Sequence, residues 1–513
     1  MNKLIIVFCA FVFSGCVQVE RDYPGYLYTI NLEKIENNRL FVELKFTGSL
    51  PDTSYFCFPK IVPGIYDDLN YGKFISGFKA VDKKGELLHV IQTDENCRQI
   101  TGANDLAVIS YAVTGGWEKF DFEGIRPYRS SESHFDSSVV ILNANSVFGY
   151  FSHQENIPFR INIKKPEEFY GATSLPRVKS SKTEDHFIAE NYRILVDNPI
   201  LYSCPDTASI RLPEISVQIA CFSGSKEKIA GELTEFIGPL VKNQTDYLGG
   251  KLATDKYTFI LYHNRNDENT HYFADGLEHS QSTLILTYAP FDMEILKNIV
   301  FGLASHEFFH TQMPLGIHSF EIANFDFNRP EFSKHLWLYE GMTEYFTIHM
   351  PIKQNMQTLG EFIQMIESKI SGMKKFNHTV SFTDMSRNIM DMPDEYMNVY
   401  FKGPLINLCL DIQLRELSGG TYGVQNLVSD LMNKYGKDKP FDDADLFNDI
   451  YTITGYPEIK AFIENYIEGN QELPLKEALQ KVGLELDNES GKIMEITPLT
   501  EKQKFLRKHW INQ

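Results

Sequence analysis

Short runs that alternate between apolar and polar residues fill the first part of the chain. Residues 40–46 alternate in this way, and two further runs, 106–111 and 139–142, are rich in apolar, strand-forming residues. A period of two is typical of strands that bury one face. Turn sequences separate the runs, as at Asp-Lys-Lys-Gly 82–85. The pattern predicts a β-sandwich-like N-terminal domain over residues 16–222.

Helical spacing begins after this region, and helices and strands are mixed over residues 223–350. Strand-like runs at 257–261 and 282–287 precede an apolar stretch at 293–304 whose spacing fits a helix. Asp292 is placed to cap the start of that helix. The pattern predicts a central α+β domain.

The rest of the chain is predicted to be mostly helical. Helical spacing recurs at 360–373, 404–417 and 457–467, which predicts a helical domain over 351–485. Residues 486–513 show little periodicity and are predicted to form a tail. The regions together predict a multidomain α+β protein.

An HExxH motif continues the predicted central helix, with His306 and His310 four residues apart. Residues at this spacing share one helix face, so both rings can approach one Zn²⁺, and Glu307 lies beside them within reach of a water molecule. A catalytic zinc takes three protein ligands and keeps one position open. Glu340, in a later Trp-x-x-Glu-Gly segment, is the predicted third ligand. The sequence therefore predicts a zinc peptidase with one Zn²⁺ per chain.

The alternative for this motif is an amphipathic helix that carries two histidines on the protein surface. The stretch before the motif, 293–304, is apolar with helical spacing, which favours a buried helix. Buried histidines need polar partners, and a metal ion supplies one. We therefore prefer the metal site.

The net charge of the chain limits the kinds of molecule it is expected to bind. The chain of 513 residues has a formal net charge of −19. Nucleic-acid binding needs clustered Lys and Arg, so no nucleic acid partner is predicted. The acidic protein is an equally poor match for anionic lipid headgroups. Attachment to a membrane is therefore expected to come from a lipid on the protein.

The start of the chain has the features of a bacterial lipoprotein signal. Lys3 precedes an apolar run at 4–13 that is too short to span a bilayer, and small residues stand before Cys16. The pattern predicts a signal peptide at 1–15, cleavage before Cys16 and a lipid on its thiol; the alternative is ordinary secretion with cleavage nearby. Val17 is not acidic, unlike a signal for inner-membrane retention. We expect a lipid-anchored protein of the bacterial cell envelope, held at the outer membrane.

Five cysteines remain beyond this segment, and an odd number leaves at least one free thiol. Cys57 could pair with Cys97, and Cys204 with Cys221, in an oxidising compartment. Cys409 lies in an apolar helical run and is expected to be a packed thiol. Their spacing is not that of a zinc ribbon.

Several blocks of the sequence together resemble the glycyl aminopeptidase family of gluzincin zinc peptidases. The gap of 29 residues between His310 and Glu340, and the Trp-x-x-Glu-Gly segment itself, are similar to the zinc block of that family. Further similar blocks lie at 62–66, 195–199, 276–279 and 400–403. The resemblance spans about residues 28–484.

This resemblance implies a thermolysin-like α+β zinc peptidase domain between the β domain and the helical domain. The chain departs from the family in two places. After the second histidine, where the family usually has Trp-Asn and basic residues, this chain has Thr-Gln-Met-Pro-Leu-Gly at 311–316, which weakens the case for a glycine preference. Only 29 residues follow Leu484, too few for the C-terminal PDZ domain that family members often carry.

The catalytic roles follow from the motif and the resemblance. Glu307 would take the proton of the attacking water and pass it to the leaving amine. Tyr400 is the candidate donor to the developing oxyanion, so the helical domain would complete the active site; Tyr396 is the competing ring. Glu344, four residues after Glu340, is expected to accept the free N–H of a zinc histidine, and it is also the competitor for the position of third ligand.

The substrate is predicted to be a peptide. Glu278 precedes the run at 282–287, the predicted edge strand to which an extended peptide could add. Its carboxylate would pair with a free α-ammonium and enforce aminopeptidase action; a structural salt bridge is the alternative. Gly276 and His279 are further candidates for substrate contacts. Two other functions remain open: a zinc endopeptidase, and a non-catalytic, peptide-binding surface lipoprotein that keeps zinc for stability.

Overall fold

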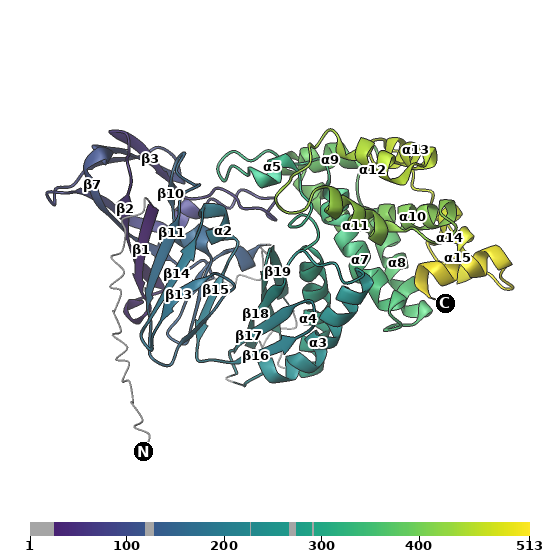
Figure 1. Ribbon diagram of the computed structural model, residues 1–513, viewed down its shortest axis with the longest axis horizontal. Coiled ribbons are helices and arrows are strands. Elements are labelled where there is room, and N and C mark those ends of the chain that lie inside the picture. Colours follow the sequence, from purple (N-terminus) through teal and green to yellow (C-terminus); the bar gives the residue numbers. More distant parts are fainter. Residues whose placement is uncertain (1–24, 118–127, 226, 266–272, 290–291, 513) are drawn as a thin grey trace, which may run out of the picture.

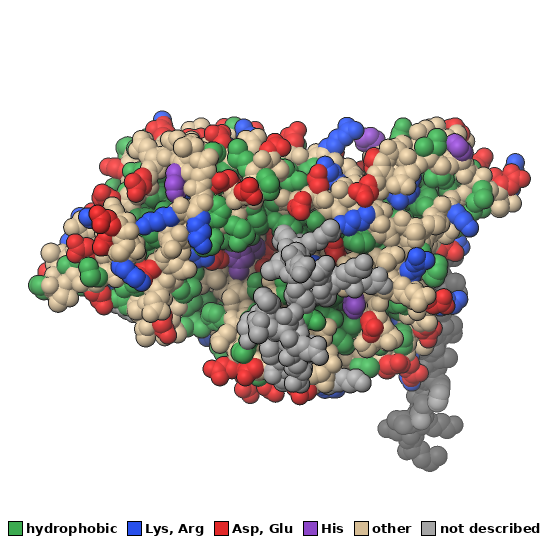
Figure 2. Space-filling view, turned by 180° about the vertical axis from the view of Figure 1, so that it is seen from behind, with side chains coloured by type: hydrophobic (Ala, Val, Ile, Leu, Met, Phe, Trp, Pro, Cys, Tyr) green, Lys and Arg blue, Asp and Glu red, His purple; other side chains and the backbone are tan. Residues whose placement is uncertain are grey.

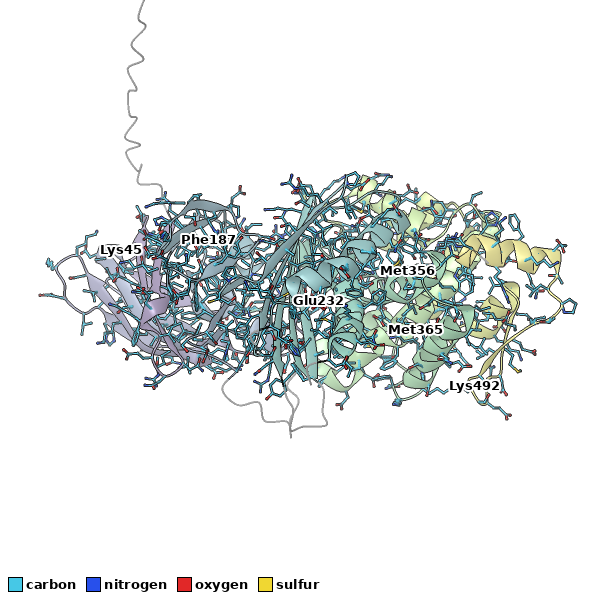
Figure 3. All side chains as sticks on the ribbon, turned by 90° about the horizontal axis from the view of Figure 1, so that it is seen from below. Lys45, Phe187, Glu232, Met356, Met365 and Lys492 are labelled. Atoms are coloured by element: carbon cyan, nitrogen blue, oxygen red, sulfur yellow. A yellow bond between two sulfur atoms is a disulfide. The ribbon has the colours of Figure 1, made fainter. Side chains whose placement is uncertain are left out.

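A computed structural model of the chain describes residues 25–117, 128–225, 227–265, 273–289 and 292–512. The predicted signal peptide and the lipidation site Cys16 lie outside these residues. The chain runs from an N-terminal sheet-rich domain through a mixed domain to a helical region (Figure 1). Seen from below, Lys45 and Lys492 lie near opposite ends of an elongated molecule (Figure 3). The multidomain α+β class predicted from the sequence is confirmed.

The N-terminal domain contains a seven-stranded sheet and two four-stranded sheets around one hydrophobic core. The large sheet has the order β13 (Arg177–Ser180), β14 (Glu184–Ala189), β11 (Phe159–Lys164), β1 (Gly25–Asn31), β2 (Arg39–Thr47), β7 (Leu106–Thr114), β4 (Ile75–Asp82). The smaller sheets are β10 (Tyr150–Phe151), β3 (Thr53–Cys57), β6 (Cys97–Thr101), β5 (His89–Gln92) and β12 (Tyr170–Ala172), β15 (Ile200–Ser203), β9 (Val139–Leu142), β8 (His134–Phe135). In β2 buried and exposed residues alternate as the sequence pattern predicts.

One of the two possible cysteine pairs is bonded. Cys57 and Cys97 lie opposite each other on the antiparallel strands β3 and β6 and form a disulfide. Cys204 and Cys221 are both free, because Cys204 is exposed whereas Cys221 is buried in β17 (Ser216–Ser223). Cys409 is a buried free thiol, as predicted.

The central region is built on a five-stranded sheet. Its order is β16 (Thr207–Arg211), β17, β18 (Lys256–Arg265), β20 (Ser282–Ala289), β19 (Phe273–His279). Helices α3 (Ala230–Tyr247) and α4 (Met293–Phe309) pack in the same core. The side chain of Asp292 caps α4 by accepting hydrogen bonds from the backbone N–H groups of Glu294 and Ile295.

The edge strand was misassigned from the sequence. Residues 282–287 lie in β20, which is hydrogen-bonded on both sides, to β18 and to β19. The edge of the sheet is β19, which contains Glu278 and pairs antiparallel with β20. The physical reason is that β20 is buried from Ser282 to Thr287, as an inner strand must be, whereas the mixed sequence of β19 suits an edge.

The central and helical regions share one hydrophobic core. Helix α7 (Gly341–Lys353) runs through this core and packs on α10 (Lys402–Leu417). Other helices of this region are α8 (Leu359–Met373), α11 (Val424–Lys434), α12 (Leu446–Thr454), α13 (Pro457–Tyr466) and α14 (Leu475–Lys481). In the described part of the chain, no helix has the length and apolar character needed to cross a membrane.

The predicted tail at 486–513 is wrong. Strand β22 (Ile493–Glu495) pairs with β21 (Leu484–Leu486), and helix α15 (Glu501–Ile511) packs against the core. Trp510 is fully buried, and its indole N–H donates to the hydroxyl of Tyr345 at 2.9 Å. Periodicity missed α15 because its apolar residues are few among many charged ones, although Thr500 and a glutamine at the third helical position form a capping box.

The outer surface carries charges of both signs. On the face shown in Figure 2, Lys and Arg side chains are scattered among acidic ones.

Candidate active site

Helix α4 ends at the HExxH motif and brings two imidazoles together. The Nε2 atoms of His306 and His310 are 3.1 Å apart. Glu340 joins them from the junction between the short helix α6 (Leu336–Tyr339) and α7, with its Oε2 3.5 Å from Nε2 of His306 and 3.6 Å from Nε2 of His310. All three side chains are buried, and their ligand atoms converge on one point.

The other nitrogen of each ring is already occupied. Nδ1 of His310 donates to the carbonyl of Met313 at 3.0 Å, and Nδ1 of His306 lies 2.9 Å from Oε2 of Glu344. A carbonyl or a carboxylate can only accept, so both Nδ1 atoms carry the proton. Lys369, from α8, pairs with the other oxygen of Glu344. The arrangement turns Nε2 of each ring toward the centre, as in a metal site whose histidines are oriented by outer partners.

The charges around this point favour a cation at its centre. Burial lowers the pKa of His310 to about 4, which leaves the ring neutral with a lone pair on Nε2. Burial opposes a charge on His306 as well, but Glu340 and Glu344 outweigh it and raise its pKa well above the usual range. Oε2 of Glu340 has no hydrogen-bond donor among the described residues. Two imidazoles and a carboxylate with one open side are the donor set of catalytic zinc sites, so the residues fit this ion.

Glu307 lies beside the three predicted ligands. It is buried, and its Oε2 has no hydrogen-bond partner within the described chain. Burial raises its pKa to about 8. A Cβ at Gly276 would lie 2.7 Å from Oε1 of Glu307, so only glycine allows the edge strand β19 to approach the carboxylate this closely.

Glu278 faces the same centre from β19, two residues after Gly276. Its carboxylate lies within 4.8 Å of the ligand atoms of Glu307 and His310. Burial, with the charges of Glu340 and Glu307, raises its pKa well above the usual value. Among the described residues, Lys and Arg form no ion pair with Glu278. The site therefore holds a half-buried carboxylate with no basic partner among the described residues.

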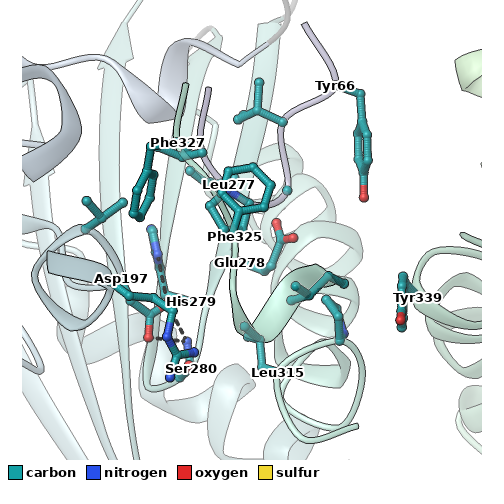
Figure 4. A pocket seen from close by; sticks show the side chains of 18 of the residues that line it. Tyr66, Asp197, Leu277, Glu278, His279, Ser280, Leu315, Phe325, Phe327 and Tyr339 are labelled. Carbon is teal, nitrogen blue, oxygen red and sulfur yellow. Dashed lines mark hydrogen bonds and ion pairs between the residues drawn. The ribbon is translucent and has the colours of Figure 1, made fainter. Parts of the chain in front are cut away.

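A loop of the N-terminal domain covers Glu278. Gly64, in the segment 62–66, has a φ of +83°, and a Cβ there would lie 2.5 Å from Oε1 of Glu278. His279 faces the other side of β19, where its Nδ1 lies 3.5 Å from Asp197. Figure 4 shows the Glu278 carboxylate pointing away from this His279–Asp197 pair. The structure thus brings Gly276 and Glu278 to the centre, but not His279.

Tyr400 reaches the centre from the helical region. A Cβ on Gly341 would lie 2.8 Å from the Cα of Gly403, so two glycines allow α7 and α10 to touch just beyond Glu340 and Tyr400. The ring centroid of Tyr400 is 5.7 Å from that of His306. Burial and the charge of Glu340 raise the pKa of Tyr400 well above its usual value, so the phenol keeps its proton.

Three side chains at this site, Tyr66, Tyr128 and Lys369, were not predicted from the sequence. The hydroxyl of Tyr396 lies 2.7 Å from that of Tyr400, and Tyr66 and Tyr128 of the N-terminal domain pack on the Tyr396 ring. Tyr66 ends the block at 62–66, which was the available signal for it. Tyr128 and Lys369 had no motif, because only the tertiary fold places them here.

Two family models match the sequence. The Peptidase M61 N-terminal domain matches residues 27–204, and M61 glycyl aminopeptidase matches residues 300–406. Together the matches cover more than half of the chain. The chain belongs to the M61 glycyl aminopeptidase family. The match over residues 300–406 includes the HExxH motif, Glu340 and Tyr400. Strand β19, with Glu278, lies between the two matched ranges.

Solved structures agree on the fold. An aminopeptidase N family protein from Idiomarina loihiensis has a TM-score of 0.77 at 20% identity, over 90% of this chain and 79% of that one. An M1 zinc metallopeptidase from Deinococcus radiodurans has a TM-score of 0.53 at 12% identity, over 88% of this chain and 94% of the other. Among curated proteins, the search found no match.

Proposed function

We propose that this M61 family peptidase is a zinc-dependent aminopeptidase that removes N-terminal residues from peptides. The observation that carries the proposal is the convergence of Nε2 of His306, Nε2 of His310 and Oε2 of Glu340 on one point. His306, His310 and Glu340 would hold the ion. Bound zinc would supply a positive charge that acidifies water and polarises the scissile carbonyl.

The side chains divide the proton transfers between them. Glu307 lies against β19 and accepts the proton of the attacking water, then delivers it to the leaving amine. The raised pKa of its carboxyl suits a group that both accepts and donates a proton near neutrality. Tyr400 donates a hydrogen bond to the oxygen of the developing tetrahedral centre.

Glu278 gives the proposal its exopeptidase character. A half-buried carboxylate without a basic partner among the described residues is unfavourable, and a substrate's α-ammonium would supply the missing charge. The edge strand β19 offers backbone groups to which an extended peptide can pair. An endopeptidase, the second candidate, would leave the Glu278 carboxylate without a cationic partner in every complex, and for that reason we prefer the aminopeptidase.

The first test is the variant Glu307→Gln. It removes the base but none of the predicted ligands. We expect kcat to fall at least roughly 10³-fold, near the upper range for general acid–base groups, with zinc content unchanged near one equivalent. Metal analysis and a free-amine aminoacyl substrate, with a chelator control, provide the measurement. Full activity would remove Glu307 from the mechanism, and a protein that takes up no zinc would remove the metal site and with it the function.

The second test separates exopeptidase from endopeptidase. Wild-type enzyme should cleave peptides with a free N-terminus and leave N-acetylated ones intact. Glu278→Ala should lose most of its activity on free peptides, because the ammonium loses its partner. The ratio of activity on free peptides to activity on N-acetylated peptides should therefore fall. A wild-type ratio in the variant would favour the endopeptidase. Zinc binding without hydrolysis of any peptide would favour the non-catalytic peptide-binding protein.

We also propose that the protein is a lipid-anchored component of the bacterial cell envelope, attached through Cys16 at the outer membrane. The apolar run after Lys3 and the small residues before Cys16 support this location. The Cys57–Cys97 disulfide suits an oxidising compartment outside the cytoplasm. Cys16→Ser should move the protein from the membrane fraction to the soluble fraction.

A further inference from the structure

A pocket opens beside Glu278 and is walled by segments of two domains (Figure 4). The N-terminal domain contributes the loop 62–66, and the catalytic region contributes β19, the turn after the HExxH motif and the segment that leads to Glu340. Its wall is largely apolar and includes Val62, Leu277, Leu315, Ile322, Phe325 and Phe327. It is the kind of cavity that accepts an apolar group with a few fixed polar contacts.

Most polar groups in this wall already have protein partners. Asp197 accepts from the backbone N–H of Ser280 at 3.1 Å and lies 3.5 Å from His279. The Ser333 hydroxyl donates to Asp443, and the Tyr339 hydroxyl accepts from a backbone N–H at 3.1 Å. These groups are therefore not available to bind a polar ligand.

The charged groups of the wall differ in their exposure. Arg193 and Glu331 line the pocket but are exposed to solvent. Glu278 is the charged lining residue that faces the catalytic centre. A ligand in the pocket would thus meet mostly apolar side chains, together with His279, whose Nε2 has no hydrogen-bond partner among the described residues, and one carboxylate at the side nearest the predicted metal ligands.

Geometry connects the pocket with the reaction centre. Glu278 lines the pocket, and its carboxylate also lies within 4.8 Å of the ligand atoms of Glu307 and His310. The α-carbon of an N-terminal residue carries the ammonium, the scissile carbonyl and the side chain. With the ammonium at Glu278 and the carbonyl beside Glu307, the side chain is one bond from Cα and has this cavity next to it.

We propose that this pocket binds the side chain of the substrate's N-terminal residue and that the enzyme selects large apolar residues such as leucine, methionine and phenylalanine. The inference rests on the proposed aminopeptidase function and adds the class of substrate. A glycine residue would leave the apolar wall without contact. Burying a side chain of this size favours its substrate over the glycine substrate by roughly 10- to 100-fold in kcat/KM.

A panel of free-amine aminoacyl anilides tests the preference. The zinc-loaded wild-type enzyme is assayed with glycyl, alanyl, leucyl and phenylalanyl substrates. Ile322→Trp fills the pocket from α5 (Phe320–Ala323). The matched control is Phe320→Trp, on the same helix, at a side chain that is 60% exposed and does not line the pocket.

The proposal expects leucyl and phenylalanyl substrates to exceed the glycyl substrate roughly 10- to 100-fold in kcat/KM. Ile322→Trp should lower these two at least tenfold and leave the glycyl substrate within twofold, while Phe320→Trp changes none of them. Glycyl hydrolysis equal to or faster than leucyl hydrolysis overturns the proposal. An equal loss on all substrates in Ile322→Trp overturns it too.

A binding measurement tests the pocket independently of the proposed aminopeptidase function. If the wild-type enzyme cleaves no substrate, the aminopeptidase function fails, and calorimetric titration with L-phenylalanine and glycine then decides the pocket. Tighter binding of L-phenylalanine, by tenfold or more and lost in Ile322→Trp, supports it. Equal binding of the two amino acids overturns it.

Discussion

Two buried clusters of histidine and carboxylate side chains lie at opposite ends of helix α7, and their charges are balanced in different ways. At the first end, Glu340 precedes the helix and Glu344 lies in its first turn. At the other end, His349 is completely buried against Asp411 of α10. The same residue types and the same burial therefore occur about two and a half helical turns apart.

The cluster at His349 is closed. Both oxygens of Asp411 are used, one by the Tyr345 hydroxyl at 2.8 Å and the other by Arg415 at 3.0 Å. Burial alone would raise the pKa of Asp411, but Arg415 and His349 hold it below its usual value. The two nitrogens of His349 face the Tyr247 hydroxyl at 2.7 Å and a backbone carbonyl at 3.0 Å. Each charge has its counter-charge inside the chain.

The cluster at Glu340 is open. Glu278, Glu307 and Glu340 meet around His306 and His310, and oxygens of Glu307 and Glu340 lack donors in the described structure. Lys369 pairs with Glu344 instead. A buried polar group left unpaired is expensive to keep. We infer that such groups persist where a ligand supplies the missing partner, and that balance of charge, rather than residue type, distinguishes the two clusters.

The largest expected effect separates two carboxylates within the open cluster. Glu340→Gln removes a predicted ligand, so zinc content and turnover should both be lost. Glu344→Gln removes only a hydrogen-bond partner of His306 and should lower metal affinity about 10- to 100-fold. Zinc titration of both variants is the measurement. If Glu344→Gln lost its zinc and Glu340→Gln kept it, Glu344 would be the third ligand.

This contrast also shows what the sequence could predict. The four-residue spacings of the two histidines and of Glu340 and Glu344 are properties of a helix face, so the convergence of these side chains was accessible from local geometry. The glycine at 276 and the carboxylate at 278 were accessible from a resemblance. All of these positions belong to short segments whose chemistry is visible in the chain.

The parts that were missed depend on tertiary contacts. Lys369 reaches Glu344 from another helix, and Tyr128 arrives from the N-terminal domain. The pocket beside Glu278 is assembled from segments far apart in the chain and has no periodic signature. The helix α15 was taken for a tail because its burial rests on a few residues, Trp510 above all. Local patterns carry no information on such long-range packing.

The second prediction breaks the closed cluster. Asp411→Asn leaves Arg415 buried without its counter-charge, which should destabilise the protein by roughly 3–5 kcal/mol. The measurement is thermal unfolding, with kcat/KM and zinc content determined on the folded fraction; both should stay near wild type. The double variant Asp411→Leu with Arg415→Met replaces the pair by apolar groups and should recover much of the stability. A loss of zinc at unchanged stability would contradict a structural role.

The smallest of the three effects concerns the tyrosine at the edge of the open cluster. Tyr400→Phe removes one hydroxyl but keeps the ring beside His306. We expect kcat to fall by roughly 10²- to 10³-fold, the usual loss for one donor to an oxyanion, with little change in KM or in thermal stability. Tyr396→Phe serves as the matched variant, because its hydroxyl contacts that of Tyr400 at 2.7 Å. Its loss should be smaller. A larger loss in Tyr396→Phe would assign the donor to that ring, and a fall in stability without a fall in kcat would make the tyrosine pair part of the core, like the closed cluster at the far end of α7.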